Sequence, residues 1–437
     1  MTTTTHEATT DSGTTGDVKA EVTAWLERNW DPDLTVAEWW ERLADSGWAV
    51  PTWPVEWHGR GLSRSDGLTV HEAITEFGAL ASSGGLGTIL AAPTIIVHGT
   101  DEQRRRYLRA TAAGQVGWCQ LFSEPSAGSD LAGLNTRAEL DGDEWVVNGQ
   151  KVWTSAGQWA DLGMLLARTD PNVPKHQGIT YFVCNMHQPG VDIRPLRELT
   201  GRAIFNEVFL TDVRVPADAA IGGINNGWAV ANTTLMFERS GIGAGTVAGV
   251  AALPGSLAGD LDQRAGDYVN APQRLAGGAV VMTVDNLAAL ARTRGTLDAT
   301  VRQDLAQLHS MKEIARFMDL RQQALAATGR DIPGIGNLGK LSMSRILRFT
   351  RDLSGRILGP YATLHAYNAT ERDALDAATH TPGYGAITES LLFSAAPPIY
   401  GGTDEIQHNI LGERVLGLPK EPGPDRTTPF RDLPKNG

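Results

Sequence analysis

The sequence predicts a mainly α protein with a central antiparallel β domain, ordered as helices, then strands, then a helix bundle. Three observations support this order. Residues 17–118 repeat apolar side chains at spacings of three and four, residues 119–225 form short alternating segments, and residues 226–437 return to long helical periods. A chain of 437 residues has room for roughly three domains. Its 41% hydrophobic and 20% charged residues are compatible with packed cores.

The N-terminal region is expected to be helical after a short tail. Residues 1–16 are rich in threonine and contain no arginine or lysine, so we expect a disordered tail and neither a signal nor a transit peptide. Seven of the 12 tryptophans lie between Trp25 and Trp57, which favours an aromatic packing layer. The periodicity predicts helices over Val18–Trp30, Val36–Ser46, Ser63–Ala81 and, with Asp101 as the cap, Asp101–Gly114.

The middle region has the pattern of an antiparallel β domain. Asn148-Gly149 lies between two strand-like runs and predicts a hairpin, because this dipeptide suits a two-residue turn. Further strands are expected over Leu162–Ala167, Ile179–Asn185 and Glu207–Val215.

Beyond residue 226 the sequence predicts long helices joined by short links, as in an up-and-down bundle. Residues 252–278 break the helical period and are interpreted as an insertion or a flexible loop. The expected helices cover Trp228–Val250, Val280–Arg294, Thr300–Thr328, Ile335–Leu358 and Thr403–Leu416.

Composition and motif content exclude several classes of function. A net charge of −12 argues against nucleic acid as a partner, because binding phosphates requires a basic surface. The sequence has no apolar run long enough to span a membrane, no histidine pair at metal-ligand spacing, and no glycine-rich phosphate loop after a strand. Cys119 and Cys184 are too few for a disulfide framework or a cysteine zinc site, so we expect a cytoplasmic protein without a metal.

Three segments contain the residues best suited to chemistry. The segment 121–132 reads LFSEPSAGSDLA, and its small and hydroxyl residues would let a flat ring or a phosphate approach the main chain. The others are 148–155 (NGQKVWTS) and 399–407 (IYGGTDEIQ). Together with Asp212–Pro216 and a helix opening at Gly227, they resemble the acyl-CoA dehydrogenase family, in the family's order and over residues 20–419.

This resemblance implies a fold and a reaction. The fold would comprise an N-terminal helical domain, an antiparallel β-barrel or sandwich, and a C-terminal four-helix bundle, with FAD between the last two. The reaction would be α,β-dehydrogenation of an acyl-CoA thioester, with electrons passed to an electron-transferring flavoprotein. Such a role belongs to fatty acid or lipid metabolism, including β-oxidation.

The catalytic base is sought at two positions. Many family members carry a glutamate in the last motif, where this chain has Gly401. A subgroup resembling isovaleryl-CoA and long-chain dehydrogenases places it on the first long helix of the bundle, before an arginine, and here Glu238 precedes Arg239. We therefore expect Glu238 to be the base, with a main-chain N–H at Gly401 or Glu238 polarising the thioester carbonyl. A helix-surface Glu238 paired with a cation is the alternative, and Glu405 is a weaker rival.

The resemblance also implies binding residues. Phe122 and Ser123 would contact the flavin ring, with Leu121 as a further contact. Trp153 would form the wall of the ring, although a core aromatic is the alternative interpretation, and Ser155 would lie near N5. The FAD ribityl and phosphate region would be approached by Thr403 and Glu405, at the start of the last helix. On the CoA side the resemblance implies Ser129 and Arg239.

Two departures from the family pattern leave alternatives open. The usual Arg-x-x-Phe-Gly element is missing, and Arg292 is the best match for the arginine that contacts the FAD diphosphate. The adenosine-side glycine-rich element is reduced to Arg356–Pro360. Both resemble actinobacterial members, some of which act on sterol-derived CoA esters or as paired unlike subunits. We expect a homo-oligomer, either a dimer or a tetramer. A half-site subunit of a hetero-oligomer, and a same-fold flavin oxidase or monooxygenase, are the alternatives.

Overall fold

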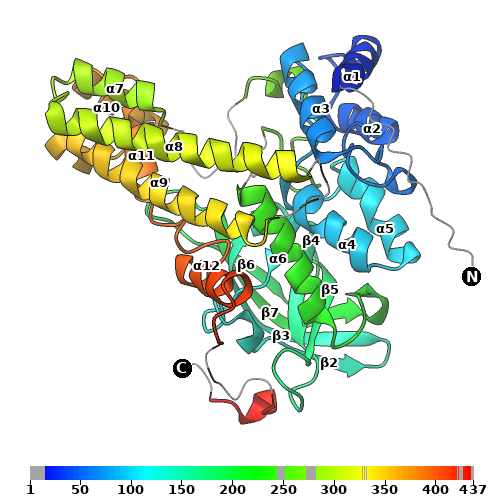
Figure 1. Cartoon of the computed structure of the whole chain (residues 1–437). Helices are drawn as coiled ribbons and strands as arrows, with labels where there is room; N and C mark the ends of the chain where they lie inside the picture. Colours follow the sequence, from blue (N-terminus) through cyan, green and yellow to red (C-terminus); the bar gives the residue numbers. More distant parts are fainter. Residues whose placement is uncertain are drawn as a thin grey trace, which may run out of the picture.

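The computed structural model describes residues 15–243, 251–271, 282–326, 328, 330, 332–420, 422 and 427–434 (Figure 1). The first helix begins at Thr15, so the predicted disordered tail lies, apart from its last two residues, outside the described part of the chain. Three groups of elements follow one another along the chain, as expected: helices, a β sheet, and a second group of helices.

The N-terminal helices are built around buried tryptophans. Trp39 and Trp40 are almost completely buried, and their indole N–H groups donate to the carbonyl oxygens of Leu80 (2.7 Å) and Ala81 (2.8 Å). The packing layer expected from the sequence is therefore present, because a buried indole requires a hydrogen-bond acceptor. The helices are α1 (Thr15–Asn29), α2 (Val36–Ser46), α3 (Arg64–Phe77), α4 (Ala92–His98) and α5 (Asp101–Ala112), the last capped by Thr100 and not by Asp101.

The β domain is one eight-stranded sheet in the order β6-β7-β3-β2-β4-β5-β8, with β1 beside β4. The sequence predicted an antiparallel barrel or sandwich, whereas the sheet is open and mixed, because β1 runs parallel to β4. Its strands are β1 (Trp118–Leu121), β2 (Arg137–Asp141), β3 (Glu144–Ser155), β4 (Leu162–Arg168), β5 (Ile179–Asn185), β6 (Val191–Pro195), β7 (Phe205–Pro216) and β8 (Ala220–Ile221).

The hairpin predicted at Asn148-Gly149 is wrong, because β3 runs through both residues and pairs with β7 along its length. The Asn148 side chain is held by Asp212 on β7, accepting from its N–H and hydrogen-bonding its carboxylate, both at 3.0 Å. Gly149 is required because a Cβ there would collide with Thr136. The real turn precedes β3, at Gly142, where a φ of 68° suits glycine.

The C-terminal helices include two that the sequence analysis did not predict, α10 and α11. Part of the predicted insertion is placed as well: residues 251–271 pack against the N-terminal helices, where the N–H of Val36 donates to the carbonyl of Gln263 at 2.8 Å. The helices are α6 (Gly227–Gly243), α7 (Val284–Thr293), α8 (Ala299–Ala326), α9 (Ile335–Leu358), α10 (Ala369–Thr379), α11 (Tyr384–Phe393) and α12 (Asp404–Ile410).

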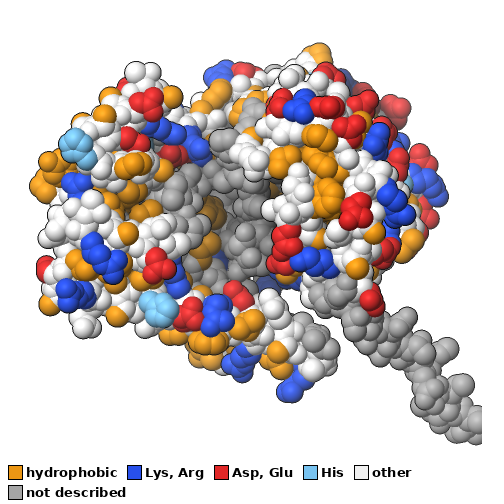
Figure 2. Space-filling model, turned by 90° about the horizontal axis from the view of Figure 1, so that it is seen from above, with side chains coloured by type: hydrophobic (Ala, Val, Ile, Leu, Met, Phe, Trp, Pro, Cys, Tyr) orange, Lys and Arg blue, Asp and Glu red, His pale blue; other side chains and the backbone are white. Residues whose placement is uncertain are grey.

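Helix α6 lies where the three regions meet (Figure 1). Leu235 and Phe237 pack against the N-terminal core, and Gly227 lets the start of the helix approach β5 closely. In the view from above, the bundle lies on the left and the N-terminal helices lie on the right (Figure 2). A residue on the side of α6 that faces the β domain therefore lies near the place where the N-terminal helices, the β domain and the bundle meet.

Candidate active site

At the end of β1, Leu121 and the first loop residue, Phe122, present their side chains in opposite directions. Leu121 is completely buried in the core of the β domain, so its main chain is what remains for contact with a ligand. Phe122 points the other way and packs edge-on against Tyr181, with ring centroids 5.9 Å apart. Ser123 is partly exposed, and its carbonyl accepts a hydrogen bond from Val152 at 2.9 Å. This contact places Ser123 beside the distorted part of β3.

A buried ion pair between Lys151 and Glu124 stabilises this loop. The Lys151 ammonium lies 2.9 Å from the Glu124 carboxylate and also donates to the carbonyl of Phe122 at 3.1 Å. Glu124 accepts further hydrogen bonds from the main-chain N–H groups of Asn135 (2.7 Å) and Thr136 (2.9 Å). Burial alone would raise the pKa of Glu124, but the Lys151 charge and these hydrogen bonds lower it. The carboxylate thus fixes both ends of the loop.

Trp153 is presented outward by an irregularity in β3. The pairing with β7 shifts register between Lys151 and Thr154, and Trp153 takes a φ of 60°, which is rare for a bulky residue. The residue remains 61% exposed, and its ring meets that of Phe205 edge-on, with centroids 6.0 Å apart. The alternative interpretation of Trp153 as a core aromatic residue is therefore wrong. An exposed indole beside the partly exposed Ser155 is suited to stacking with a flat ring such as a flavin.

Glu238 faces the β domain from α6. Its side chain is partly buried and hydrogen-bonds to Gln120 on β1. Burial is the main cause that raises the pKa of Glu238, while the contact with Gln120 and the neighbouring Arg239 charge oppose the shift. The pKa of Arg239 is lowered, mainly by burial and further by the positive charge of Arg414 in the segment after α12, while the Glu238 carboxylate opposes the shift. The partner of Glu238, Gln120, directly precedes Leu121 and Phe122 in the chain. A carboxyl group with a raised pKa in this position is suited to proton transfer.

The segment before α12 has no acid at the position where many family members carry one. Gly401 has a φ of 63° and Gly402 of 80°, conformations that disfavour any side chain. The Thr403 hydroxyl accepts from the N–H of Ile406 at 3.2 Å and so caps α12. Glu405 is exposed. This arrangement agrees with a base located elsewhere.

Two buried groups that the sequence analysis missed hold this segment. Asp404 pairs with Lys340 at 3.0 Å and Arg348 at 2.6 Å, both on α9. Gln407 donates to the carbonyl oxygens of Gly401 (2.9 Å) and Gly402 (3.1 Å). The spacing of Asp404 and Gln407, one turn apart on a short helix, was the available signal that they share a face.

Gln120 was also missed, although it is the polar residue of an otherwise apolar strand. In the described structure it lies between the Phe122 loop and Glu238. A polar side chain within such a strand is a recognisable signal, because burying it requires a partner.

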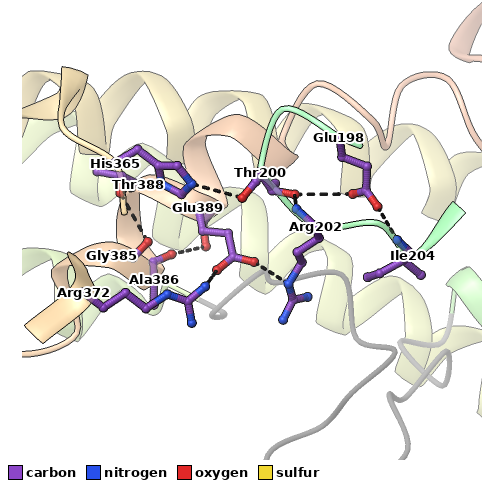
Figure 3. A network of polar contacts seen from close by, with 11 residues as sticks. Glu198, Thr200, Arg202, Ile204, His365, Arg372, Gly385, Ala386, Thr388 and Glu389 are labelled. Carbon is purple, nitrogen blue, oxygen red and sulfur yellow. Dashed lines mark hydrogen bonds and ion pairs between the residues drawn. The ribbon is translucent and has the colours of Figure 1, made fainter. Parts of the chain in front are cut away.

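A network of polar contacts joins the loop between β6 and β7 to the C-terminal helices (Figure 3). The buried Glu389 on α11 pairs with Arg202, in the loop between β6 and β7, at 2.9 Å and with Arg372 on α10 at 3.1 Å. His365 donates from Nε2 to the carbonyl of Thr200 in the same loop, at 3.1 Å. That loop continues into Ile204, whose carbonyl accepts from Ala156 at 2.9 Å. The Trp153 turn is therefore connected to α11 through the loop.

Arg292 is not brought to the other predicted residues within this chain. It is exposed in the last turn of α7, and this helix lies at the end of the bundle far from β3 (Figure 1). Ser129 is exposed on the loop after β1, on the β-domain side. The described chain thus gathers Phe122, Ser123, Trp153 and Ser155 on the β domain and Glu238 on α6, but separates Arg292 from them.

Neither a membrane-spanning helix nor a metal-ion site is found among the described residues. No helix among the described residues combines the length and the apolar character needed to cross a bilayer. Within the same ranges, histidine, cysteine and acidic side chains nowhere gather in threes as a metal ion would require. Both cysteines are buried and free.

Comparison with known proteins identifies the family. Residues 13–115 match the N-terminal domain of acyl-CoA dehydrogenases and residues 119–213 match their middle domain. Acyl-CoA dehydrogenase IpdE1 of Mycobacterium tuberculosis is 36% identical over 385 residues, which are 88% of each chain. IpdE1 of Mycolicibacterium smegmatis is 34% identical, over 92% of this chain and 97% of its own.

Solved structures agree. A variant of the Tcur3481-Tcur3483 steroid ACAD matches with a TM-score of 0.68 and 25% identity, over 93% of this chain and 99% of that one. The ChsE4-ChsE5 complex from Mycobacterium tuberculosis matches with a TM-score of 0.64 and 25% identity, over 95% of this chain and 100% of that one. On the extent of these matches, the chain belongs to the acyl-CoA dehydrogenase family.

Proposed function

We propose that the protein catalyses the α,β-dehydrogenation of an acyl-CoA thioester to the trans-2-enoyl-CoA, with Glu238 as the base, and passes the electrons to an electron-transferring flavoprotein. The observation that carries the proposal is Glu238 itself: a partly buried carboxyl group with a raised pKa, hydrogen-bonded to Gln120 where α6 meets β1. We place this activity in fatty acid or lipid breakdown. A cytoplasmic location is proposed from the two free cysteines.

Proton removal is the step that needs this environment. The α-proton of a thioester is weakly acidic, and a carboxylate in water is a weak base. Removing water from the Glu238 carboxylate raises its pKa and so strengthens it as a base. Gln120 holds the group in one orientation, and Arg239 keeps a positive charge near the anionic form.

The cofactor of this family is FAD, and the exposed surface of Trp153 fits a flat ring. When bound, FAD supplies the acceptor for the hydride that leaves the β-carbon. We propose that Trp153 and Phe122 form the walls of the ring site and that Ser123 and Ser155 supply polar contacts at its edge. Thr403, at the start of α12, is proposed for the ribityl region.

The thioester carbonyl requires a donor where negative charge develops. A residue inside an α-helix donates its N–H to the preceding turn, which commits the N–H of Glu238. Gly401 lies in a loop and is the better candidate for this contact. We propose its main-chain N–H for the task, with Ser129 and Arg239 on the CoA side.

The proposal is tested with Glu238→Gln and, as the control, Glu27→Gln, which changes an exposed glutamate on α1 outside the proposed site. Purified proteins are mixed with acyl-CoA without oxygen, and flavin absorbance is followed. Glu238→Gln should slow bleaching by at least about 100-fold, the contribution of a general base, while Glu27→Gln should match wild type. Wild-type bleaching rates in Glu238→Gln would contradict the assignment of the base.

The acyl group is best found by a screen. One matched structure is named a steroid ACAD, so the panel should contain sterol-derived CoA esters beside linear and branched chains. We propose a bulky CoA ester as the substrate class. Faster bleaching by short linear acyl-CoA than by any sterol-derived ester would argue against this choice.

A hetero-oligomer is a second candidate, favoured by the position of Arg292. Its helix, α7, lies far from β3, the strand that contains Trp153 (Figure 1), so an arginine contact to FAD of this kind would require a neighbouring subunit. One structural match is named as a complex of two proteins, ChsE4 and ChsE5. Protein produced alone should then contain little FAD and gain it when a co-encoded partner is present. A yellow homo-oligomer, measured by light scattering and flavin content, would support the single-subunit proposal.

A further inference from the structure

The last described segment of the chain, residues 427–434, returns to the β domain, and we call it the C-terminal strap. The strap lies at the lower edge of the sheet and contains the short red turn Phe430–Asp432 (Figure 1). The N–H of Phe430 donates to the carbonyl of Val173 at 2.9 Å, and that of Arg431 to the carbonyl of Pro171 at 3.1 Å. The Arg431 guanidinium also donates to the Asn172 side chain at 2.7 Å. The strap therefore extends the loop between β4 and β5 by main-chain pairing.

Phe430 covers a buried arginine. The guanidinium carbon of Arg168 lies 3.4 Å from the centroid of the Phe430 ring, a stacked cation–π contact. Arg168 is 4% exposed, and burial lowers its pKa to about 10. It donates to the carbonyl oxygens of Ala132 (2.7 Å), Lys175 (3.0 Å) and Leu134 (3.2 Å). The ring thus closes the outer side of a cation that holds the end of the loop after β1.

A second residue, Lys175 in the β4–β5 loop, also contacts the loop after β1. Its ammonium group donates to both carboxylate oxygens of Asp130, each at 2.9 Å. Asp130 directly follows Ser129 and precedes the turn that Arg168 holds. The strap contacts the β4–β5 loop and Arg168. Lys175 then holds Asp130, and Arg168 holds Ala132 and Leu134, which follow the Ser129-Asp130 turn.

We propose that Phe430 is a positioning residue, through which the C-terminal strap holds the Ser129-Asp130 turn in the conformation that receives the CoA part of the substrate. This inference rests on the proposed function for the assignment of Ser129 to CoA. It goes beyond that assignment because it gives a role to a segment of the chain that lies outside all the residues predicted to touch ligands.

The strap should act on substrate binding and not on the chemical step. The hydrogen bond of Glu238 goes to Gln120 on β1, and Trp153 lies on β3. The hydrogen bonds and the cation–π contact of the strap go instead to the β4–β5 loop and to Arg168. Loss of the strap would leave these groups in place while freeing the Ser129-Asp130 turn. An ordered turn binds more tightly than a mobile one because less conformational freedom is lost on binding.

The central experiment compares Phe430→Ala and a chain that ends at Lys420 with wild type, both as FAD-loaded proteins. Loss of one cation–π contact of this kind corresponds to about tenfold in an equilibrium constant. We therefore expect KM for acyl-CoA to rise about tenfold in Phe430→Ala, with kcat and flavin content within about twofold of wild type. Phe430→Tyr, which keeps the ring, and Asp432→Asn, an exposed change in the same strap, are the matched controls and should behave as wild type.

A synthetic peptide of residues 427–437 provides the rescue. Added to the chain that ends at Lys420, it should lower KM toward the wild-type value, whereas a peptide with alanine in place of Phe430 should not. A fall in kcat with unchanged KM, or equal effects of Phe430→Ala and Phe430→Tyr, would overturn the proposal.

Hydrogen exchange separates this inference from the proposed function. Peptides covering residues 126–136 should exchange faster in Phe430→Ala than in wild type, while those covering Lys151–Ser155 should not change. If wild type processes no acyl-CoA, the proposed function fails, and exchange alone decides whether the strap orders the turn. Unchanged exchange at residues 126–136 would overturn the positioning role whatever the substrate.

Discussion

Glu389 on α11 and Arg202 in the β6–β7 loop form an ion pair at 2.9 Å across the junction of the bundle and the β domain. The carboxylate is 4% exposed, whereas the guanidinium is 29% exposed. The pair matters for the site because the β6–β7 loop also accepts the hydrogen bond from Ala156, just after Ser155. The proposed flavin wall is thus connected to the bundle through one buried carboxylate.

Glu389→Gln should weaken the contact between the β6–β7 loop and α11. The amide keeps the shape of the side chain but loses its charge, and Arg202 and Arg372 remain without an anion there. Since both arginines are partly exposed, we expect a loss of about 1–3 kcal/mol in the free energy of unfolding, less than for a fully buried pair. Urea unfolding and the Kd for FAD measure the two effects. Unchanged values for both would show that the pair does not hold the wall. Arg316→Gln, at a surface ion pair with Glu313 on α8, is the control.

The pKa of Glu238 predicts a pH dependence of activity. Burial raises this pKa above the ordinary value of 4.5, and the base acts when deprotonated. The rate of flavin bleaching should therefore rise with pH through the raised pKa and then level off. Stopped-flow measurements across pH 5–9 test this. A rate that is already maximal at about pH 5 would contradict a raised pKa.

The same shift predicts that activity and stability oppose each other at Glu238. A group whose pKa is raised on folding loses stability as pH increases from the ordinary value through the raised one. Above the raised pKa, wild type holds a partly buried anion, whereas Glu238→Gln does not. The variant should therefore be the more stable protein at pH 8 in urea unfolding, and the two should converge at low pH. A less stable variant at pH 8 would indicate a structural role for the carboxylate.

The buried pair of Lys151 and Glu124 should be strongly coupled. Lys151→Met leaves the Glu124 carboxylate buried without its cation, which costs about 3–5 kcal/mol for such pairs. Glu124→Gln keeps an acceptor for the N–H groups of Asn135 and Thr136. The double variant should lose clearly less stability than the sum of the two single variants. Additive losses in urea unfolding would show that the two groups act independently.

Gly227 should be intolerant of a side chain because α6 starts so close to β5. A Cβ at Gly227 would lie 2.5 Å from the main-chain carbon of Thr180. Gly227→Ala must shift α6, and Glu238 with it, so we expect a loss of about 1–3 kcal/mol and slower flavin bleaching. Gly355→Ala on α9 is the control, because a Cβ there meets nothing within 4 Å and alanine favours a helix. Equal behaviour of the two variants would contradict the close contact.

Much of the fold could be predicted from local patterns. The periods of apolar residues placed α2 and α9 at their observed bounds and β5 at Ile179–Asn185, because each segment buries one face or both. The hairpin at Asn148-Gly149 failed because the Asn148 side chain bonds to Asp212, 64 residues later, and stabilises a continuous strand. Helices α10 and α11 were missed because short helices of mixed composition have weak periods.

For the candidate site, too, some features could be predicted from the sequence and others depend on the tertiary structure. The sequence by itself determined which residue types were available: a glutamate on a long helix, a glycine where the loop acid would be, and a tryptophan after Asn148-Gly149. Tertiary structure alone decided their environments, because the pKa of Glu238 depends on burial against Gln120 and the exposure of Trp153 depends on a register shift against β7. The C-terminal strap could not be predicted at all, since Phe430 and Arg168 are separated by more than half of the chain and meet only when the chain folds back.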